Sequence, residues 1–312
     1  MEGDESFSSS KSRERKSSAE KTVKLEGLTE RRSSQPKQES AEIIVIGNEL
    51  LNGTTLDTNS HWLSRRLTSS GLLVSRKTTI RDELSTISTA FEQAISRGSA
   101  WIFALGGLGP TYDDKTLEGL AVALGTPMLI DEEAKRMLKA RQRMRAEKLG
   151  VAPGRLTNSV LKMVTLPKGS TPFPNSKGSA PGVLISSRGS CIVSLPGVPS
   201  EMKAIYAEQI APIIAKEGAR FVTCQDWIEV VGVGESRLAS SLARFSRKYP
   251  ESVYVKSHPS GSVGGKPRLK IQVIASGPRE SFAEARKKLE KVSAALRVTV
   301  QRLGGEIQRH SV

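Results

Sequence analysis

The chain has 312 residues, a net charge of +15, 37% hydrophobic residues and two cysteines. This length allows two domains with a substantial core, whereas two cysteines without a CxxC pattern exclude a disulfide framework. No run approaches the ~20 apolar residues of a membrane span, and the acidic, serine-rich start is unlike a secretory signal. We therefore expect a cytoplasmic protein without a membrane partner.

Residues 1–40 hold ten serines and charges of both signs, a composition that predicts a disordered tail. From 41 to about 220, buried-strand patterns alternate with amphipathic helical patterns. The strand patterns lie at 41–46, 72–78, 100–107, 183–186 and 191–195, and the helical patterns at 57–68, 84–96, 115–124, 131–149 and 200–215. This alternation predicts an α/β domain with a parallel sheet that helices cover on both faces.

A smaller domain is expected at 221–300, followed by a tail at 301–312. Its strand patterns lie at 227–233, 252–256 and 268–275, and its helical patterns at 235–247 and 281–295. This order is typical of a small α+β sandwich of the split βαβ kind.

The positive charge belongs to the expected folded part, because residues 1–41 contain nine Lys or Arg and eight Asp or Glu. A basic surface attracts phosphates, and it also keeps a protein soluble. Both interpretations stay open for the helix at 131–149, whose cations could bind phosphates or form a solvated face. These cations are Lys135, Arg136, Lys139, Arg141, Arg143, Arg145 and Lys148.

The segment GGLGPTYDDKT at 106–116 carries the strongest chemical signal. It follows a buried strand and precedes a helix, so its glycines let backbone N–H groups approach an anion beside the positive end of that helix. The pattern fits neither GxxxxGK[ST] nor GxGxxG, which weakens the prediction of an ordinary nucleotide-binding fold. Asp113 and Asp114 would repel a phosphate unless a cation lay between them, which indicates a divalent metal such as magnesium. The structural alternative is a helix start capped by Asp.

Two further loops with similar composition follow strands. The segment at 47–60, GNELLNGTTLDTNS, contains Glu49, Asp57 and Asn59, and SLPGVPSEMK at 194–203 contains Glu201. Ligands bind at the carboxyl ends of parallel strands, so we expect the acidic loops to face one crevice. A proline-initiated helix start explains the third loop equally well.

Four motifs occur in order: GNELLNG with DTN at 47–59, GGLGPTYDD at 106–114, PNSKGSAPG at 174–182 and LPGVPSEM at 195–202. Together with a weaker match, GVGES at 232–236, they make the chain resemble the amino-terminal half of the CinA family (competence/damage-inducible protein). That half carries a MoaB/Mog-type molybdopterin-binding domain. The resemblance implies a three-layer α/β/α domain with a mostly parallel sheet at 41–220 and a small α+β domain at 221–300.

The resemblance also implies metal-dependent pyrophosphatase activity on a nucleoside-diphosphate compound such as ADP-ribose, or on FAD. The metal, Mg, Mn or Co, would be held by Glu49, Asp57, Asp113 and Asp114. Glu49 or Asp114 would align the attacking water as the catalytic group. Phosphates would contact Gly106, Gly107, Gly109 and Thr111, and the rest of the substrate would contact Asn59, Asn175, Gly178, Pro196, Gly197 and Glu201.

Two alternatives stay open. The same crevice would suit an adenylylated pterin, as in molybdenum cofactor biosynthesis. The other alternative is a basic nucleic-acid-binding protein. Aromatic residues make up only 4% of the chain and no nucleic-acid motif occurs, so only weak, sequence-independent binding is expected.

Related domains self-associate, so we expect a homo-oligomer. Full-length CinA-like proteins continue into a nicotinamide-mononucleotide deamidase domain, and we expect no deamidase activity here.

Overall fold

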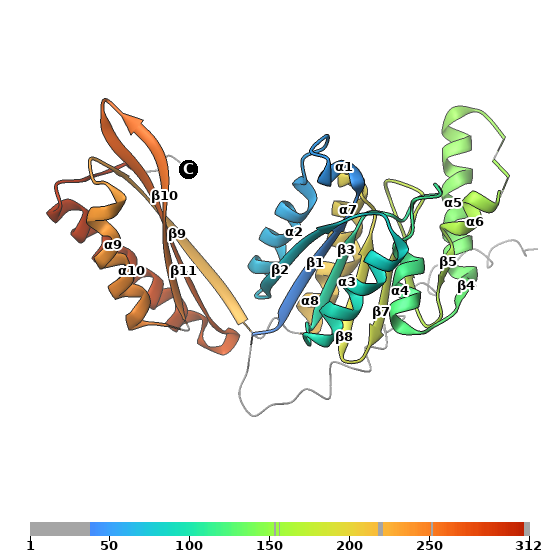
Figure 1. Ribbon diagram of the computed structural model, residues 1–312, viewed down its shortest axis with the longest axis horizontal. Helices are drawn as coiled ribbons and strands as arrows, with labels where there is room; N and C mark the ends of the chain where they lie inside the picture. Colours follow the sequence, from blue (N-terminus) through green and yellow to red (C-terminus); the bar gives the residue numbers. More distant parts are fainter. Residues whose placement is uncertain (1–37, 153, 156, 218–220, 251, 309–312) are drawn as a thin grey trace, which may run out of the picture.

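The computed structural model describes residues 38–152, 154–155, 157–217, 221–250 and 252–308. Figure 1 shows two units, a larger one around a six-stranded sheet and a smaller one around a four-stranded sheet. Residues 1–37 of the tail expected at 1–40 lie outside the described part of the chain, and so do residues 309–312. No helix among the described residues combines the length and apolar character needed to cross a membrane.

The larger sheet is built from β1 (Ser40–Ile46), β2 (Leu73–Ile80), β3 (Trp101–Leu105), β6 (Thr171–Phe173), β7 (Gly182–Ser187) and β8 (Ser190–Leu195). Their order is β2-β1-β3-β8-β7-β6. The β1–β2, β1–β3 and β3–β8 pairs are parallel, and the two pairs that include β7 are antiparallel. The mostly parallel sheet predicted from the sequence is confirmed.

The helices of the larger unit are α1 (Asn48–Leu51), α2 (Thr58–Ser69), α3 (Leu84–Ser96), α4 (Thr116–Leu124), α5 (Glu132–Leu149), α6 (Asn158–Lys162), α7 (Pro199–Ile205) and α8 (Ala211–Glu217). A π-helical turn at Tyr206–Ile210 joins the last two, where the sequence predicts one continuous helix. A short antiparallel pair, β4 (Met128–Ile130) with β5 (Thr165–Pro167), is not anticipated.

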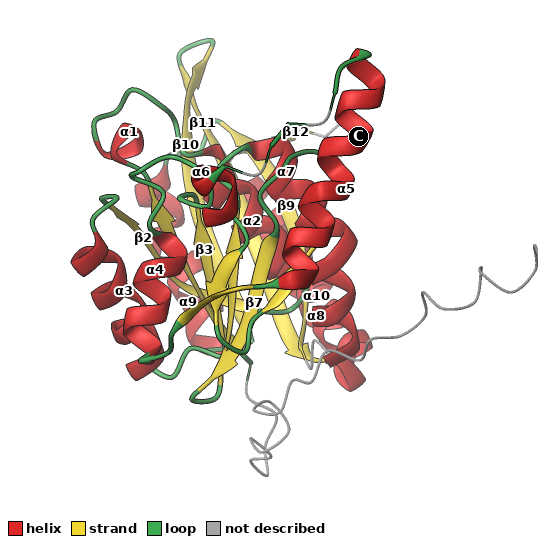
Figure 2. Cartoon of the chain, turned by 90° about the vertical axis from the view of Figure 1, so that its right-hand side faces the viewer, coloured by secondary structure: helices red, strands yellow, loops and turns green. Residues whose placement is uncertain are grey.

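Strand β1 shows why helices cover both faces of this sheet. Its side chains alternate, so Ile43 and Val45 pack into one core cluster and Ile44 and Ile46 into another. The first cluster includes buried residues of α2, α7 and α8, and the second those of α3 and α4. Figure 2 shows α3 and α4 on one side of the strands and α7 and α8 on the other. The three-layer arrangement follows from this alternation.

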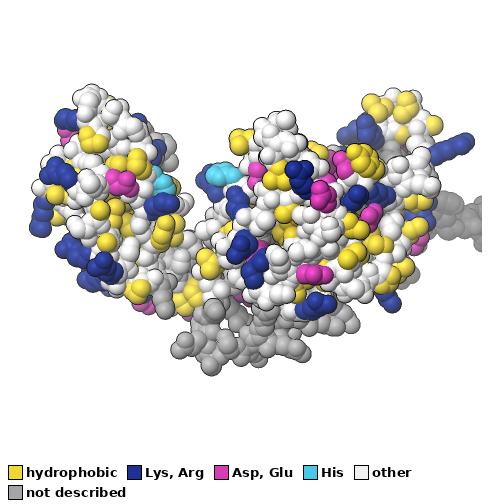
Figure 3. Space-filling view, in the orientation of Figure 1, with side chains coloured by type: hydrophobic (Ala, Val, Ile, Leu, Met, Phe, Trp, Pro, Cys, Tyr) yellow, Lys and Arg dark blue, Asp and Glu magenta, His cyan; other side chains and the backbone are white. Residues whose placement is uncertain are grey.

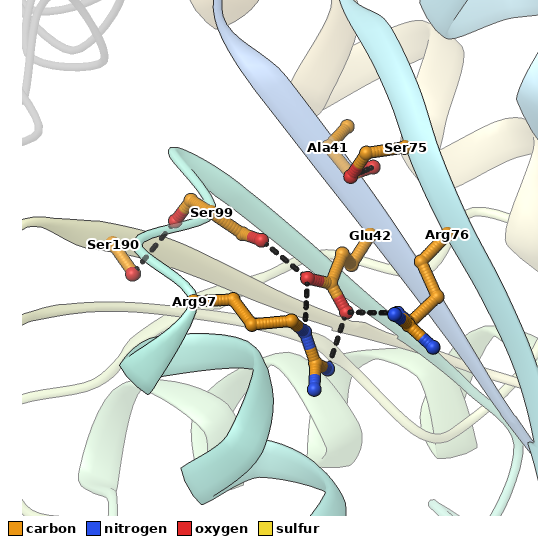
Figure 4. A network of polar contacts seen from close by, with 7 residues as sticks. All are labelled: Ala41, Glu42, Ser75, Arg76, Arg97, Ser99 and Ser190. Atoms are coloured by element: carbon orange, nitrogen blue, oxygen red, sulfur yellow. Dashed lines mark hydrogen bonds and ion pairs between the residues drawn. The ribbon is translucent and has the colours of Figure 1, made fainter.

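A buried carboxylate anchors the amino-terminal edge of the sheet (Figure 4). Glu42 in β1 is 3% exposed, and the Arg97 guanidinium donates to both of its carboxylate oxygens, at 2.8 and 2.6 Å. The Ser99 hydroxyl donates a third hydrogen bond of 2.6 Å. Burial raises the pKa of Glu42, but these hydrogen bonds and the positive charge of Arg97 outweigh burial and hold the pKa below its ordinary value. The network ties β1 to the segment before β3.

The smaller unit consists of β9 (Phe221–Val231), α9 (Glu235–Lys248), β10 (Val253–Val263), β11 (Lys266–Pro278), α10 (Phe282–Arg302) and β12 (Glu306–Gln308). Its strand order is β10-β11-β9-β12, and each pair is antiparallel. This is the split βαβ arrangement predicted for the segment. The short β12 lies within residues 301–312, which were expected to form a tail. Ile307 packs against the core of this unit, so this strand belongs to the fold.

Candidate functional site

A cleft of about 720 Å³ opens where β1 and β3 end. Its floor includes Ile46 and Leu105, the last residues of these strands. Thirteen of the fourteen site residues predicted from the sequence line this one cleft, and the remaining one is Asn175. The thirteen are Glu49, Asp57, Asn59, Gly106, Gly107, Gly109, Thr111, Asp113, Asp114, Gly178, Pro196, Gly197 and Glu201.

The turn after β3 requires its two glycines. Gly106 and Gly107 have φ of +102° and +66°, in the region that favours glycine. A side chain at Gly106 would collide with the Ile46 carbonyl oxygen, and one at Gly107 would collide with the Thr116 hydroxyl. That hydroxyl instead donates a hydrogen bond of 2.8 Å to the Gly106 carbonyl. The carboxyl end of β3 therefore lies directly against the carboxyl end of β1, and the backbone of the turn lines the cleft.

Thr111 organises the two adjacent carboxylates of this loop. Its backbone N–H donates to Asp114 Oδ2 at 2.8 Å, and its hydroxyl bonds both Asp113 and Asp114. The Lys162 ammonium donates to the Thr111 carbonyl oxygen at 2.6 Å. The hydrogen bond from Thr111, together with the charges of Lys162 and Lys115, holds the pKa of Asp113 below its ordinary value. The Asp113 carboxylate is therefore favoured in its charged form.

Asp82 belongs to this cleft, and the sequence analysis missed it. It lies two residues after β2, and its Oδ2 accepts a hydrogen bond of 2.8 Å from the Asn48 backbone N–H. Burial raises the pKa of Asp82, and the charges of Glu49, Asp113 and Asp114 raise it further. Carboxylates that follow three neighbouring strands thus repel one another across one cleft. The strand-end rule that identified the other loops would also have identified Asp82.

These oxygen donors are the kind that a hard divalent cation prefers. No three His, Cys, Asp or Glu side chains in the described part of the chain converge closely enough to enclose a metal ion. The Asp57 carboxylate also has a structural role, since it caps α2 by accepting from the backbone N–H of Ser60 at 2.9 Å. A Mg²⁺ ion, which usually keeps waters and substrate phosphates beside one or two carboxylates, would fit such an open set of acids.

Asn175 acts behind the cleft rather than in its wall. Its Nδ2 donates to Glu201 Oε2 at 2.6 Å and to the Ala180 carbonyl at 2.8 Å. Its Oδ1 accepts from the backbone N–H groups of Lys177 and Gly178. Asn175 therefore shapes the loop at 177–180, whose residues line the cleft.

Cations from two segments join the acids in the cleft wall. Arg145 of α5 and Lys177 both line it. Of the seven cations that the sequence analysis singled out on this helix, Arg145 is the one in the lining. The cleft thus combines carboxylates, a glycine-rich backbone and cations, which together suit a ligand with several phosphate oxygens.

A family model described as "Probable molybdopterin binding domain" matches residues 42–216, a range that contains every residue of the cleft lining. A relative from Aeropyrum pernix is 43% identical over 269 residues, 86% of this chain and 96% of its own. A relative from Sulfurisphaera tokodaii is 40% identical over 268 residues, 86% of this chain and 97% of its own. Both are described only as "Protein".

Two of the similar solved structures are the following. One is described as the protein CinA with unknown function from Thermoplasma acidophilum; it is 37% identical, with a TM-score of 0.49, and the match covers 56% of this chain and 98% of that chain. The other is described as the molybdopterin biosynthesis enzyme MoaB from Thermus thermophilus; it is 17% identical, with a TM-score of 0.37 and coverage of 58% and 96%.

Proposed function

The chain belongs to the family of probable molybdopterin-binding domains, and from this premise we propose that its cleft binds a phosphorylated heterocyclic compound and hydrolyses a diphosphate within it. One observation carries the proposal. The carboxylates of Glu49, Asp82, Asp113 and Asp114 share one cleft with the backbone of the glycine turn and with two cations. We propose ADP-ribose or FAD as the substrate, with a divalent cation as cofactor.

In this proposal one or two of the carboxylates of Glu49, Asp113 and Asp114 would hold the cation, together with waters and oxygens of the substrate. When bound, a divalent cation neutralises phosphate charge and makes a nearby water more acidic. The Gly106 N–H already donates to the Leu195 carbonyl oxygen at 3.0 Å, so the Gly107 backbone N–H and the guanidinium of Arg145 would bind phosphate oxygens and orient the diphosphate. Asp114 or Glu49 accepts the proton of the attacking water.

The reaction would be a hydrolysis at phosphorus. The water oxygen forms a bond to one phosphorus as the bond between that phosphorus and the bridging oxygen breaks, and the bridging oxygen leaves with the other phosphate. From ADP-ribose the products are AMP and ribose 5-phosphate. FAD would give AMP and FMN in the same way.

A second candidate is a protein that binds molybdopterin without hydrolysing a nucleotide. The description of the family model names the pterin ligand, which supports this candidate without ranking it above the first. An adenylylated pterin also combines phosphates with a heterocycle, so the same cleft would suit it. The two candidates differ in turnover rather than in the class of ligand.

A substrate screen tests the proposal. Purified protein is incubated with ADP-ribose, FAD, NAD or molybdopterin in the presence of Mg²⁺, Mn²⁺ or Co²⁺, and products are separated by chromatography. Release of AMP that stops on addition of EDTA is the expected result. Tight binding of molybdopterin without turnover of any nucleotide would establish the second candidate instead.

A further inference from the structure

The four-stranded sheet of the smaller unit packs its own helices on one face and leaves Trp227 and Tyr254 exposed on the other, where α2 of the larger unit also contacts β9. Both helices of this unit, α9 and α10, pack on the same face, with Ile228, Val230, Ile271 and Val273 in the shared core. Because side chains alternate along a strand, the residues between these point to the other face. Figure 1 shows α9 and α10 together on one side of β9, β10 and β11.

Strand register places aromatic and polar side chains together on this second face. Lys256 of β10, Gln272 of β11 and Trp227 of β9 stand opposite one another in one row. Tyr254 lies in the row on one side and His258 in the row on the other. Trp227 is 38% exposed, Tyr254 is 53% exposed, and the rings of Trp227 and His258 lie 5.4 Å apart. Large aromatic surfaces are therefore held open on a rigid support.

Hydrogen bonds between side chains stabilise this arrangement. His258 Nε2 lies 3.3 Å from Gln272 Oε1, and Gln272 Nε2 donates to Gln225 Oε1 at 3.2 Å. The three residues come from three neighbouring strands, β10, β11 and β9. The face is thus ordered before any ligand binds, which lowers the entropic cost of binding.

The charge of this face is positive. Glu229 is 6% exposed and forms ion pairs with Arg268 at 3.1 Å and with Lys270 at 2.9 Å, so two cations surround one carboxylate. The exposed Lys256 adds a further cation. Residues 221–308 as a whole contain fifteen Lys or Arg and eight Asp or Glu. Figure 3 shows most of the visible Lys and Arg side chains of the smaller unit on the side of α9 and α10, so the charge of the sheet face itself comes from Lys256, Arg268 and Lys270.

We propose that this sheet face, defined by Trp227, Tyr254, Lys256, His258 and Lys270, binds single-stranded nucleic acid without sequence preference. Bases of a single strand stack on exposed aromatic rings, and its phosphates pair with the neighbouring cations. A duplex hides the faces of its bases and cannot use the rings. A second copy of this chain fits less well, because two positive faces would repel each other.

Binding of a fluorescently labelled oligo(U) of ~20 nucleotides to the full chain tests this proposal, measured by fluorescence anisotropy at ~50 and ~200 mM salt. Trp227→Ala is expected to lower the affinity at least ~5-fold, as for the loss of one stacked base. Trp227→Phe keeps an aromatic ring and should retain most of the affinity. A duplex of equal length should bind more weakly than the single strand at the higher salt concentration.

A matched pair of charge reversals separates a site from diffuse attraction. Lys256→Glu lies on the proposed face, and Lys287→Glu makes the same charge change at an exposed position of α10. The first should weaken binding several-fold more than the second. Equal losses in both, together with wild-type affinity of Trp227→Ala, would overturn the proposal. A second outcome would also overturn it. In that outcome the wild type binds no oligonucleotide, and light scattering shows that Trp227→Ala abolishes self-association. If Trp227→Ala does not fold, Tyr254→Ala supplies the stacking test.

Discussion

The Asp82 carboxylate accepts a hydrogen bond of 2.8 Å from the backbone N–H of Asn48, 34 residues earlier in the chain. This contact joins the segment after β2 to the segment after β1. Burial in this position raises the pKa of Asp82, and the charges of Glu49 and the Asp113–Asp114 pair raise it further. The fold therefore carries a cost of bringing like charges together, which a bound cation would relieve.

Asp82→Asn is expected to raise the melting temperature near neutral pH in the absence of metal. Asparagine can accept the same hydrogen bond from Asn48 and carries no charge for its neighbours to repel. A carboxyl whose folded pKa is raised binds its proton more tightly in the folded state. Its contribution to stability is thus largest at low pH and falls as the pH rises through the folded pKa, above the ordinary 3.8. The stability of Asp82→Asn should lack this decrease with rising pH.

Thermal unfolding of both proteins at about pH 4 and about pH 8, with EDTA or with Mg²⁺, measures the effect. Mg²⁺ should stabilise the wild type more than Asp82→Asn, since the variant has less repulsion to relieve. A variant that melts lower than the wild type at both pH values would show that the charged carboxylate supports the fold instead.

Asp114→Asn should lower turnover of ADP-ribose or FAD by at least ~10²-fold. The change keeps the size of the side chain and an acceptor for the Thr111 N–H, but it removes a charge from the cleft. Asp131→Asn is the matched control, because Asp131 caps α5 through a hydrogen bond of 2.7 Å from Ala134 and does not line the cleft. Asparagine caps a helix about as well as aspartate, so this control should be as active as the wild type.

A double variant tests whether the two acidic loops act together. Glu49→Gln alone should resemble Asp114→Asn. The double variant should lose much less than the product of the two single losses, as residues of one catalytic unit do. Wild-type turnover in both single variants would mean that the acidic loops are structural caps.

Much of the cleft could be predicted from the sequence because its residues follow buried strands. Gly106, Asp114 and Glu49 follow strands whose apolar runs are evident, and parallel strands end at one edge of the sheet. Asp82 was missed because β2 is mostly exposed and no glycine motif follows it. Asn175 was assigned to the ligand through the family resemblance of its motif, and the sequence does not reveal that its hydrogen bonds go to its own loop and to Glu201.

Features that depend on distant pairings could not be predicted. Trp227 and His258 come together only through the register of β9, β10 and β11. Aromatic and basic residues are not interleaved along the chain, so the sequence alone does not indicate this surface. The position of Arg145 could not be predicted either. Helix periodicity indicates that its side chain is exposed, but not that it lines the cleft.

Arg145→Ala is expected to raise KM for the diphosphate substrate about 3- to 10-fold and leave kcat nearly unchanged. A cation that contacts phosphate oxygens equally in the ground state and the transition state contributes to uniform binding, which appears in KM. Arg143→Ala is the matched control, because this exposed arginine of the same helix does not line the cleft. Steady-state kinetics of both variants distinguish the outcomes. Equal changes in KM would show that α5 acts only through its overall charge.

Glu42→Gln is expected to lower the free energy of unfolding near neutral pH by about 1–3 kcal/mol, since it removes charge-assisted hydrogen bonds from Arg97 inside the protein. The folded pKa of Glu42 is lowered, so its contribution is fully present above the ordinary 4.5 and is lost as the pH falls through the folded pKa. The difference between variant and wild type should therefore shrink in acid.

Urea unfolding at about pH 7 and about pH 3.5 tests this dependence. Glu284→Gln is the control, because its ion pair with Lys288 lies on the exposed surface of α10 and should not affect the urea midpoint. If Glu42→Gln loses as much stability in acid as at neutral pH, the side chain acts through its packing and not through its charge. A loss confined to neutral pH would instead identify the Glu42–Arg97 pair as the electrostatic anchor of β1, at the edge of the sheet remote from the cleft.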